Sequence, residues 1–316
     1  MIFVLGVVIM VWSPGTAQEI FPSRPITIVL PTNPGGSQDL SSRIVASQLE
    51  NELGVSVVIL NKPGGGQVVG AEYVRQLKPD GYTLLGMSTQ LVTVTILDPK
   101  CPVKMDDFDP ICLTAIQSNV VIASSKSPLK TIKEVIDFAK KNPGKLSYGS
   151  SGIGSTGHFW GELLKQSIGI DLTHVPFNGD AGIVTASVGG HIDLGFPTIP
   201  GARALVKGGT LRALVVSLER SPDFPEIPTI AEIGYPQASY KSWLAYLAPK
   251  GIPKPVIEKL STAFEKALNH PSVKEKLSQV GLTPAYMDAK QLREFMNKET
   301  EELKKVAQKA GMGVKY

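Results

Sequence analysis

The chain has 316 residues, of which 42% are hydrophobic, 7% aromatic and 19% charged, a composition typical of ordinary globular proteins. Its 32 Lys and Arg against 28 Asp and Glu give a net charge of +4, spread evenly along the chain, which excludes a nucleic-acid-binding protein. Two Cys and four His without paired ligand spacing exclude a zinc site, so we expect no bound metal. At roughly 100–200 residues per domain, the length predicts two domains.

The N-terminus has the pattern of a secretory signal. Residues 2–12 form an uninterrupted apolar run, which is too short to span a bilayer because a spanning helix needs about 20 apolar residues. Residues 13–17 (SPGTA) break the run and place small residues where a signal peptidase cleaves. We therefore expect residues 1–17 to be a signal peptide cleaved after Ala17, and the mature protein to be periplasmic without inserting into the membrane. No Lys or Arg precedes Arg24, so the usual basic segment is absent; a translation start further upstream, or a buried first strand in place of a signal, are the alternatives.

The two cysteines, Cys101 and Cys112, would meet an oxidising compartment if the protein is exported, and disulfides persist there. Their spacing permits a disulfide, but nothing in the sequence requires one. The sequence leaves their pairing open.

From residue 25 onward, short apolar runs alternate with amphipathic stretches. The pattern predicts strands over residues 26–30, 55–60 and 83–87, and helices over residues 37–53 and 68–77. This strand-helix-strand-helix-strand order predicts a parallel, doubly wound sheet, because parallel strands need crossover connections and helices supply them.

A similar rhythm begins again at Thr131. Helices are predicted over residues 131–141, 155–168, 181–188 and 200–207, and strands over 145–148, 173–176, 192–196 and 211–216. The remaining third is predicted to be helical, over residues 254–269, 271–279 and 288–311. Since these helices have no sheet of their own, we expect them to pack on the first unit.

The predicted fold is therefore α/β, with two doubly wound lobes joined by a two-strand hinge. The chain would cross between lobes near residues 119–125 and 240–249, so that residues 18–121 and 243–316 form one lobe and residues 122–242 the other. Ligands bind such folds in the cleft at the carboxyl ends of the strands, and hinge closure is the expected motion.

Three glycine-rich loops follow predicted strands, at residues 31–37, 61–66 and 150–158. Glycines let a ligand approach main-chain N–H groups, and a helix N-terminus favours an anion. We interpret the first and third loops as ligand-binding because hydroxyl side chains cluster beside their glycines, and the second as an ordinary turn. The first and third loops lack Lys and Arg, as do residues 176–182, so amides, hydroxyls and helix ends would hold an anion. That arrangement favours a reversible receptor.

Two enzyme readings compete with a receptor. Gly152, Gly154 and Gly157 match a dinucleotide-binding pattern, but Asp171 precedes the following strand instead of ending it, so we expect no nucleotide cofactor. No G-x-S-x-G elbow occurs in the chain. A secreted α/β hydrolase-like enzyme using Ser155 and His158 is kept as the alternative function.

Several motifs in order along the chain resemble one family. They include residues 21–26 (FPSRPI), 31–39 (PTNPGGSQD), 61–66 (NKPGGG), 79–84 (PDGYTL), 174–179 (HVPFNG) and 189–193 (GGHID). Together they resemble the substrate-binding receptors of tripartite tricarboxylate transporters, the TctC or Bug-type periplasmic proteins. The likeness covers essentially the whole mature chain.

The resemblance implies a bilobed Venus-flytrap receptor, monomeric, without catalytic activity or cofactor. Its implied partners are a small carboxylate and the subunits of a membrane permease; an orphan receptor that signals through a sensor is the alternative. The implied ligand-binding residues are Thr32, Asn33, Pro34, Gly35, Gly36, Ser88, Thr89, Ser151, Gly154, Ser155, Thr156, Asn178, Gly179 and Thr198.

Three departures from the family pattern affect the predicted cleft. One is in the turn after the third predicted strand, where Met87 and Gln90 differ from the usual small or polar residues and would alter the distal end of the pocket. Residues 177–179 read Phe-Asn-Gly where the family usually has Tyr-Lys-Gly, which removes a cation and a hydroxyl. Pro197-Thr198 stand where an Asp often follows Phe196, and this disfavours an amino acid as ligand unless Asp180 takes the place of that acid. The sequence does not name the carboxylate.

Overall fold

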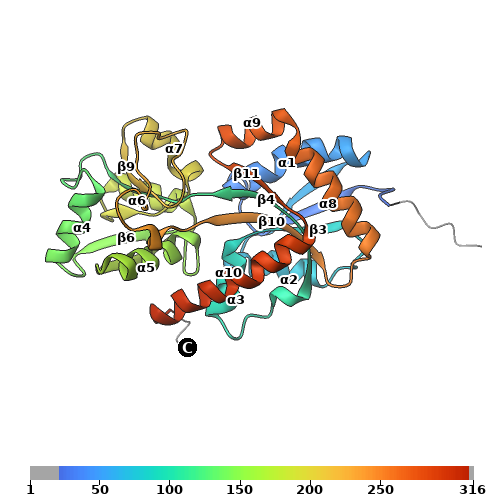
Figure 1. Ribbon diagram of the computed structural model, residues 1–316, viewed down its shortest axis with the longest axis horizontal. Coiled ribbons are helices and arrows are strands. Elements are labelled where there is room, and N and C mark those ends of the chain that lie inside the picture. The colour runs from blue at the N-terminus through green and yellow to red at the C-terminus, as the bar shows by residue number, and fades with distance from the viewer. Residues whose placement is uncertain (1–20, 313–316) are drawn as a thin grey trace, which may run out of the picture.

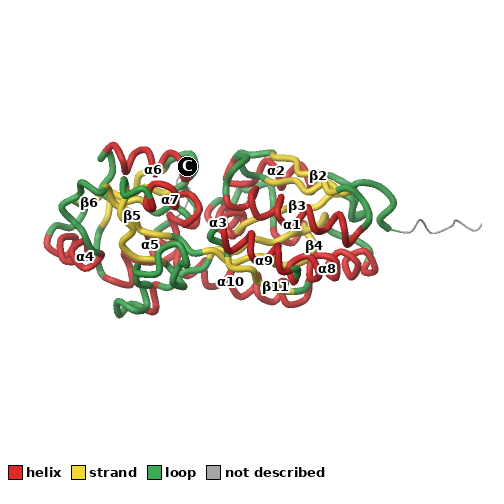
Figure 2. The backbone as a smooth tube through the Cα atoms, turned by 90° about the horizontal axis from the view of Figure 1, so that it is seen from above, coloured by secondary structure: helices red, strands yellow, loops and turns green. Residues whose placement is uncertain are grey.

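The computed structural model describes residues 21–312, which form two α/β halves side by side along the long axis of the molecule (Figure 1). Seen from above, each half has its strands enclosed by helices (Figure 2). The predicted fold class is confirmed. The predicted signal peptide and the cleavage site after Ala17 lie outside the described residues.

The first half, which we call lobe 1, contains the chain's beginning and its end. Its strands are β1 (Ile26–Leu30), β2 (Val57–Asn61), β3 (Thr83–Ser88), β4 (Phe108–Gln117), β10 (Ser242–Pro249) and β11 (Thr283–Met287). They form one sheet in the order β11-β4-β10-β3-β1-β2. Its helices are α1 (Ser37–Leu53), α2 (Val68–Arg75), α3 (Thr89–Leu97), α8 (Lys254–Asn269), α9 (Pro271–Gln279) and α10 (Ala289–Lys309).

The second half, lobe 2, is built from the middle of the chain. Its strands are β5 (Val120–Ser124), β6 (Leu146–Ser150), β7 (Leu172–Pro176), β8 (Leu194–Gly195) and β9 (Leu211–Val216), in the order β7-β6-β8-β5-β9. Its helices are α4 (Ile132–Lys141), α5 (Thr156–Ile168), α6 (Asp180–Gly189) and α7 (Ile199–Lys207). The chain therefore passes between the sheets twice, after β4 and before β10. The lobe boundaries at 121/122 and 242/243 stay a prediction.

Both sheets are mixed, where the sequence predicted parallel ones. In lobe 1, β1 is parallel to β2 and β3, but β10 runs antiparallel between β3 and β4, and β11 is antiparallel to β4. In lobe 2, β5 is antiparallel to both β8 and β9. The antiparallel strands arise because the segments that link the lobes enter the sheets directly, without a crossover helix. The sequence also did not predict α3, β4 or β11.

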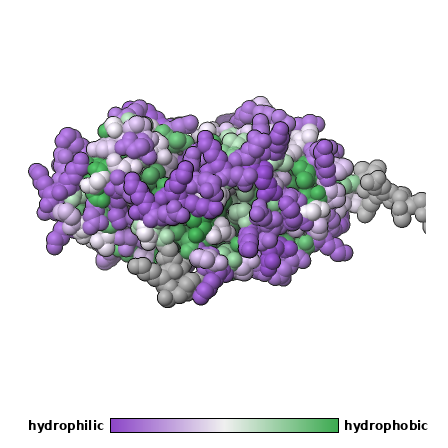
Figure 3. Space-filling model, turned by 60° about the horizontal axis from the view of Figure 1, so that its bottom comes forward, coloured by the Kyte–Doolittle hydropathy of each residue, from purple (hydrophilic) through white to green (hydrophobic). Residues whose placement is uncertain are grey.

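Apolar periodicity explains the elements that were predicted. In α4, the residues at helical spacing that were expected to face the core, Ile132, Val135, Ile136 and Ala139, are all buried. Thr131 begins this helix with a capping box, in which its hydroxyl accepts the Glu134 N–H and the Glu134 carboxylate accepts the Thr131 N–H. On the face drawn in Figure 3, hydrophilic side chains predominate and hydrophobic ones form small separate patches. Within residues 21–312, no helix has both the length and the apolar composition to cross a bilayer.

Close backbone packing seats α5 against the end of β8. A Cβ built on Gly157, in the first turn of α5, would overlap the Phe196 carbonyl oxygen. We expect Gly157→Ala to lower the free energy of unfolding by about 1–3 kcal/mol, because the backbone must move to relieve the overlap. Urea unfolding followed by circular dichroism measures this. The control is Gly208→Ala, at negative φ with its nearest contact at 3.2 Å. We expect the control to be neutral or stabilising by up to about 1 kcal/mol, and equal effects would contradict the close packing.

Candidate ligand-binding cleft

A cleft with a volume of about 610 Å³ lies between the lobes. Lobe 1 supplies the loops after β1, β2 and β3 together with residues of the crossing strands, and lobe 2 supplies the first turns of α5, α6 and α7. The lining residues are Pro31, Thr32, Asn33, Pro34, Gly35, Gly36, Ser37, Gln38, Leu40, Pro63, Gly64, Gly65, Gly66, Gln67, Ser88, Gln90, Gln117, Ser151, Thr156, Asn178, Gly179, Asp180, Ala181, Thr198, Pro200, Gly201 and Leu244. The carboxyl ends of the strands and the N-termini of helices thus meet in one cavity.

Most of the residues predicted to bind a ligand are brought together here. The predicted residues that line the cleft are Thr32, Asn33, Pro34, Gly35, Gly36, Ser88, Ser151, Thr156, Asn178, Gly179 and Thr198. Their contact with a ligand remains a prediction. The structure shows only that they share one cavity.

Three predicted residues lie behind the cleft wall. The Thr89 hydroxyl accepts the Trp243 N–H at 2.9 Å, and the Ser155 hydroxyl accepts the His158 N–H at 3.3 Å as the N-cap of α5. The Gly154 carbonyl accepts a hydrogen bond from the Thr93 hydroxyl. Their polar groups are used within the protein, and none of the three lines the cavity.

The loop after β2, interpreted from sequence as a plain turn, lines the cleft from Pro63 to Gly66 and continues into Gln67. Gln67 has a left-handed backbone with φ of 83°, and its side-chain oxygen accepts the Ser88 N–H at 3.1 Å. Two further glutamines, Gln38 and Gln117, also line the cleft and were not singled out. The available signal was topological: β2 is parallel to β1, so its following loop reaches the same sheet edge.

The N-terminus of α1 faces the cleft without a capping side chain. Gly36 is the N-cap and makes no side-chain hydrogen bond to the first turn. The first hydrogen bond of the helix is donated by the Leu40 N–H to the Gly36 carbonyl, at 2.9 Å. The N–H groups of Ser37 and Gln38 are left for a partner. By contrast, α3, α5 and α7 are capped by the hydroxyls of residues 88, 155 and 198.

Asp39 holds the loop before α1 in place. Its buried carboxylate accepts the Gly35 N–H at 3.0 Å, two hydrogen bonds from Arg43 at 2.9 and 3.0 Å, and one from Asn61 at 3.0 Å. Burial alone would raise the pKa of Asp39, but the hydrogen bonds from Arg43, Gly35 and Asn61 outweigh it and the pKa is lowered. Arg43 also balances the Asp39 charge, so the field of the α1 terminus remains positive.

In lobe 2, Asp180 occupies the first position of α6, after the N-cap Gly179. One carboxylate oxygen, Oδ2, accepts both the hydroxyl and the N–H of Thr198, at 2.6 and 3.2 Å. Burial raises the pKa of Asp180, and the two hydrogen bonds partly offset this. Among the residues that line the cleft, Asp180 carries the only ionisable side chain.

The third glycine-rich loop, residues 150–158, packs against a pair of stacked histidines. The rings of His158 and His174 lie with centroids 4.0 Å apart, the Nδ1 atom of His158 accepts the Gly154 N–H at 3.1 Å, and His174 Nε2 lies 2.7 Å from the Ser150 hydroxyl. Ser155 hydrogen-bonds the backbone of His158, not its ring. The pair named in the hydrolase alternative is therefore not assembled, and Ser150 is fully buried.

The structure also shows where the other residues considered in the sequence analysis lie. Asp171 lies just before β7 and forms an ion pair with Lys165 at 3.9 Å, away from the strand end where a dinucleotide ribose would bind. Cys101 and Cys112 are both free thiols, the first half-buried and the second buried. Within residues 21–312, no group of His, Cys, Asp and Glu side chains could hold a metal ion.

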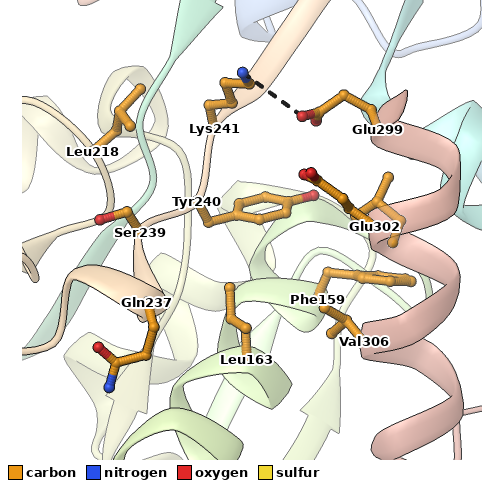
Figure 4. A pocket seen from close by; sticks show the side chains of 11 residues that line it. Phe159, Leu163, Leu218, Gln237, Ser239, Tyr240, Lys241, Glu299, Glu302 and Val306 are labelled. Atoms are coloured by element: carbon orange, nitrogen blue, oxygen red, sulfur yellow. Dashed lines mark ion pairs between the residues drawn. The ribbon is translucent and has the colours of Figure 1, made fainter. Parts of the chain in front are cut away.

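A second, smaller cavity of about 340 Å³ lies where α10 crosses to lobe 2 (Figure 4). Its walls come from α5, from residues 218–241 and from α10, and Lys241 forms an ion pair with Glu299 at 3.6 Å on its rim. It shares no lining residue with the cleft. We therefore assign the candidate site to the larger cavity.

The comparisons with known proteins agree on one family. Residues 41–312 match the family model described as "Tripartite tricarboxylate transporter family receptor". The chain is 36% identical to a UPF0065 protein in the tcbD-tcbE intergenic region of Pseudomonas sp. (strain P51), over 91% of this chain and 87% of that protein.

Solved structures give the same result. The structure of R. palustris Rpa4515 with adipate has a TM-score of 0.86 and 30% identity, covering 93% of this chain and 99% of that one. MatC (Rpa3494) from Rhodopseudomonas palustris with bound malate has a TM-score of 0.80 and 28% identity, covering 90% of this chain and 99% of that one.

The two stacked histidines should make the protein less stable in mild acid. Burial, the neighbouring His174 and Lys165 lower the pKa of His158 to about 3, and burial lowers that of His174 to about 4. Between these values and 6.5 the unfolded chain binds more protons than the folded one, so stability is full above pH 6.5 and falls as the pH drops. Each histidine contributes a slope of up to about 1.4 kcal/mol per pH unit.

We expect the free energy of unfolding, measured by urea denaturation at pH 7, 6.5, 6 and 5.5, to decline accordingly. His158→Asn offers a side-chain oxygen to the Gly154 N–H but cannot titrate, so it should remove about half of the slope assigned to the pair. Parallel profiles for the wild type and this variant would show that His158 is protonated in the folded state.

Proposed function

Because this chain belongs to the tripartite tricarboxylate transporter receptor family, we propose that it is a periplasmic receptor, not an enzyme, that captures a small carboxylate in the interlobe cleft. The captured solute would pass to the membrane permease of a tripartite transporter. Export would follow from the signal peptide predicted over residues 1–17, cleaved after Ala17. We propose that the mature chain acts as a monomer, with its lobes divided as the sequence predicts.

The uncapped N-terminus of α1 is the observation that carries this proposal. Free N–H groups and the helix dipole attract an anion, and the adjoining loop offers further amides and the Thr32 and Ser37 hydroxyls. Among the described residues that line the cleft there is no Lys or Arg, so a bound carboxylate would be held by neutral donors. Such binding is reversible, as a transport receptor requires. The adipate and malate bound to the two R. palustris neighbours support a carboxylate ligand.

The contacts between the lobes support hinge closure around the ligand. On one side of the cleft, the Thr93 hydroxyl of α3 donates to the Gly154 carbonyl of lobe 2. On another, Arg203 of α7 donates to the Gln279 carbonyl of α9. A ligand that touches both lobes has its full set of contacts only when they are close together, and this difference in affinity shifts the population toward the closed form.

A thermal-shift screen identifies the acid to be used in the binding measurements. The mature chain, residues 18–316, is tested against malate, succinate, adipate, citrate, glutamate and aromatic acids. A ligand that binds only the folded state stabilises it by about 2.7 kcal/mol at 100 times its dissociation constant. The acid with the largest shift then serves in calorimetry.

Gly36→Asp tests the α1 terminus without damaging the fold. Gly36 has φ of −75° and ψ of 169°, which any residue adopts, and a Cβ there lies 3.8 Å from its nearest neighbour, the Asn33 carbonyl oxygen. The new carboxylate caps α1, so we expect stability to hold or rise by a few tenths to about 1 kcal/mol. It also occupies the anion site, and repulsion of about 4 kcal/mol at 4 Å should raise the Kd at least 100-fold.

The control is Gly36→Asn, which caps the helix with a neutral amide. We expect it to weaken binding far less than Gly36→Asp does, and both variants to unfold at or above the wild-type temperature. Unchanged affinity in Gly36→Asp would show that the ligand does not bind at the α1 terminus.

A further inference from the structure

The cleft carries one charged side chain, and it is an acid. Asp180 lies at the start of α6, and Thr198, the N-cap of α7, fixes one of its oxygens with two hydrogen bonds. The other oxygen, Oδ1, has no hydrogen-bond or ion-pair partner within residues 21–312. The side chain is partly accessible, and the space beside it is the cleft.

The surrounding backbone makes room for this carboxylate. A Cβ built on Gly201, in the first turn of α7, would overlap the Asp180 carboxylate. The pairing with Thr198 does not need a charge, since the oxygen of an Asn amide would accept the same two hydrogen bonds. A carboxylate removed from bulk water without a cation is unfavourable, and the N-termini of α6 and α7 offset only part of this. The contacts within the protein therefore use one oxygen of this acid and leave Oδ1 available for a cation.

The two lobes thus present opposite charge to the cleft. Lobe 1 offers the uncapped, positive N-terminus of α1, where Arg43 already balances Asp39. Lobe 2 offers the Asp180 carboxylate. A dicarboxylate that placed one end at α1 would bring its second carboxylate toward lobe 2, where it would meet a like charge.

We propose that the ligand is zwitterionic, an amino-substituted carboxylate whose carboxylate binds at the α1 N-terminus and whose ammonium binds Asp180 Oδ1. This proposal rests on the proposed function of the cleft and names its substrate class. Binding the ammonium supplies the cation that Asp180 lacks, and it links the lobes through groups of opposite charge. Asp180 is then the residue that selects amino acids over unsubstituted acids.

The test uses pairs of ligands that differ by one amino group: glutamate and glutarate, aspartate and succinate, and 4-aminobutyrate and butyrate. Calorimetry and thermal shift with the full mature chain give the Kd of each. We expect the amino member of at least one pair to bind at least about 10-fold more tightly than its partner, because one charge-assisted hydrogen bond to this half-buried carboxylate is worth that or more. A preference for the unsubstituted acid in every pair that binds would overturn the proposal and leave the receptor function standing.

Asp180→Asn then assigns the preference to this residue. It keeps the two hydrogen bonds from Thr198 and loses the charge, so we expect the preference for the amino member to disappear while the unsubstituted acid binds as well or better. The matched control is Asp137→Asn on α4, an exposed acid paired with Lys133, which should change neither affinity. Retention of the preference in Asp180→Asn would overturn the role of Asp180.

Two further outcomes are separable. If Asp180→Asn does not fold, Asp180→Ser gives the same comparison with a smaller side chain, and the wild-type pairs still decide the ligand class. If no carboxylate of either kind binds the wild type, while mass spectrometry of the denatured protein finds no co-purified acid, the receptor function itself fails.

Discussion

The cleft depends on the hydrogen bonds that Asp39 makes. The carboxylate accepts the Gly35 N–H of the loop before α1 and is itself balanced by Arg43. Asn61, at the end of β2, donates to the same carboxylate and also to the Thr32 carbonyl at 3.1 Å. These bonds tie the loops after two neighbouring strands together. The start of α1 is thereby held rigid and open at once, which is the condition for binding an anion through main-chain amides.

The two connections between the lobes determine how lobe 2 is attached beside this site. β10 lies between β3 and β4, and β4 leads within three residues into β5, so in lobe 1 both connections run through the middle of the sheet; in lobe 2 the return connection starts from the edge strand β9. α10 adds a third link, since Gln166 of α5 donates to the carbonyl of Val306 near its end. In the proposed closure, rotation about the two crossings would move lobe 2 as a unit against the α1 terminus.

Local sequence patterns predicted a large part of this architecture. The bounds of α1, α8, α9, β1 and β9 are those expected, because the strands are short apolar runs, the helices carry apolar residues at helical spacing, and clear signals such as Gly54 after α1 end them. β11 was missed because its five residues (TPAYM) neither alternate nor form an apolar run, and they pair with a strand far away in the chain. The antiparallel insertion of β10 is equally non-local. In the cleft, glycines and hydroxyls indicated the loops. Glutamines have no chemical signature of a binding site, so Gln38, Gln67 and Gln117 were found only in the structure.

Ser155, one of the three predicted residues outside the cavity, is the N-cap of α5. A hydroxyl at the start of a helix accepts the helix's own N–H groups, as Ser155 does for α5, and so satisfies donors that a ligand would otherwise bind. A glycine in the same position cannot, so α1 and α6, which begin after Gly36 and Gly179, keep their N-termini available. Of these two, only α6 carries an unbalanced acid in its first turn. We propose that the N-cap residue determines how many free main-chain N–H groups a helix offers to the cleft, and that the charge in its first turn determines which end of the ligand it binds.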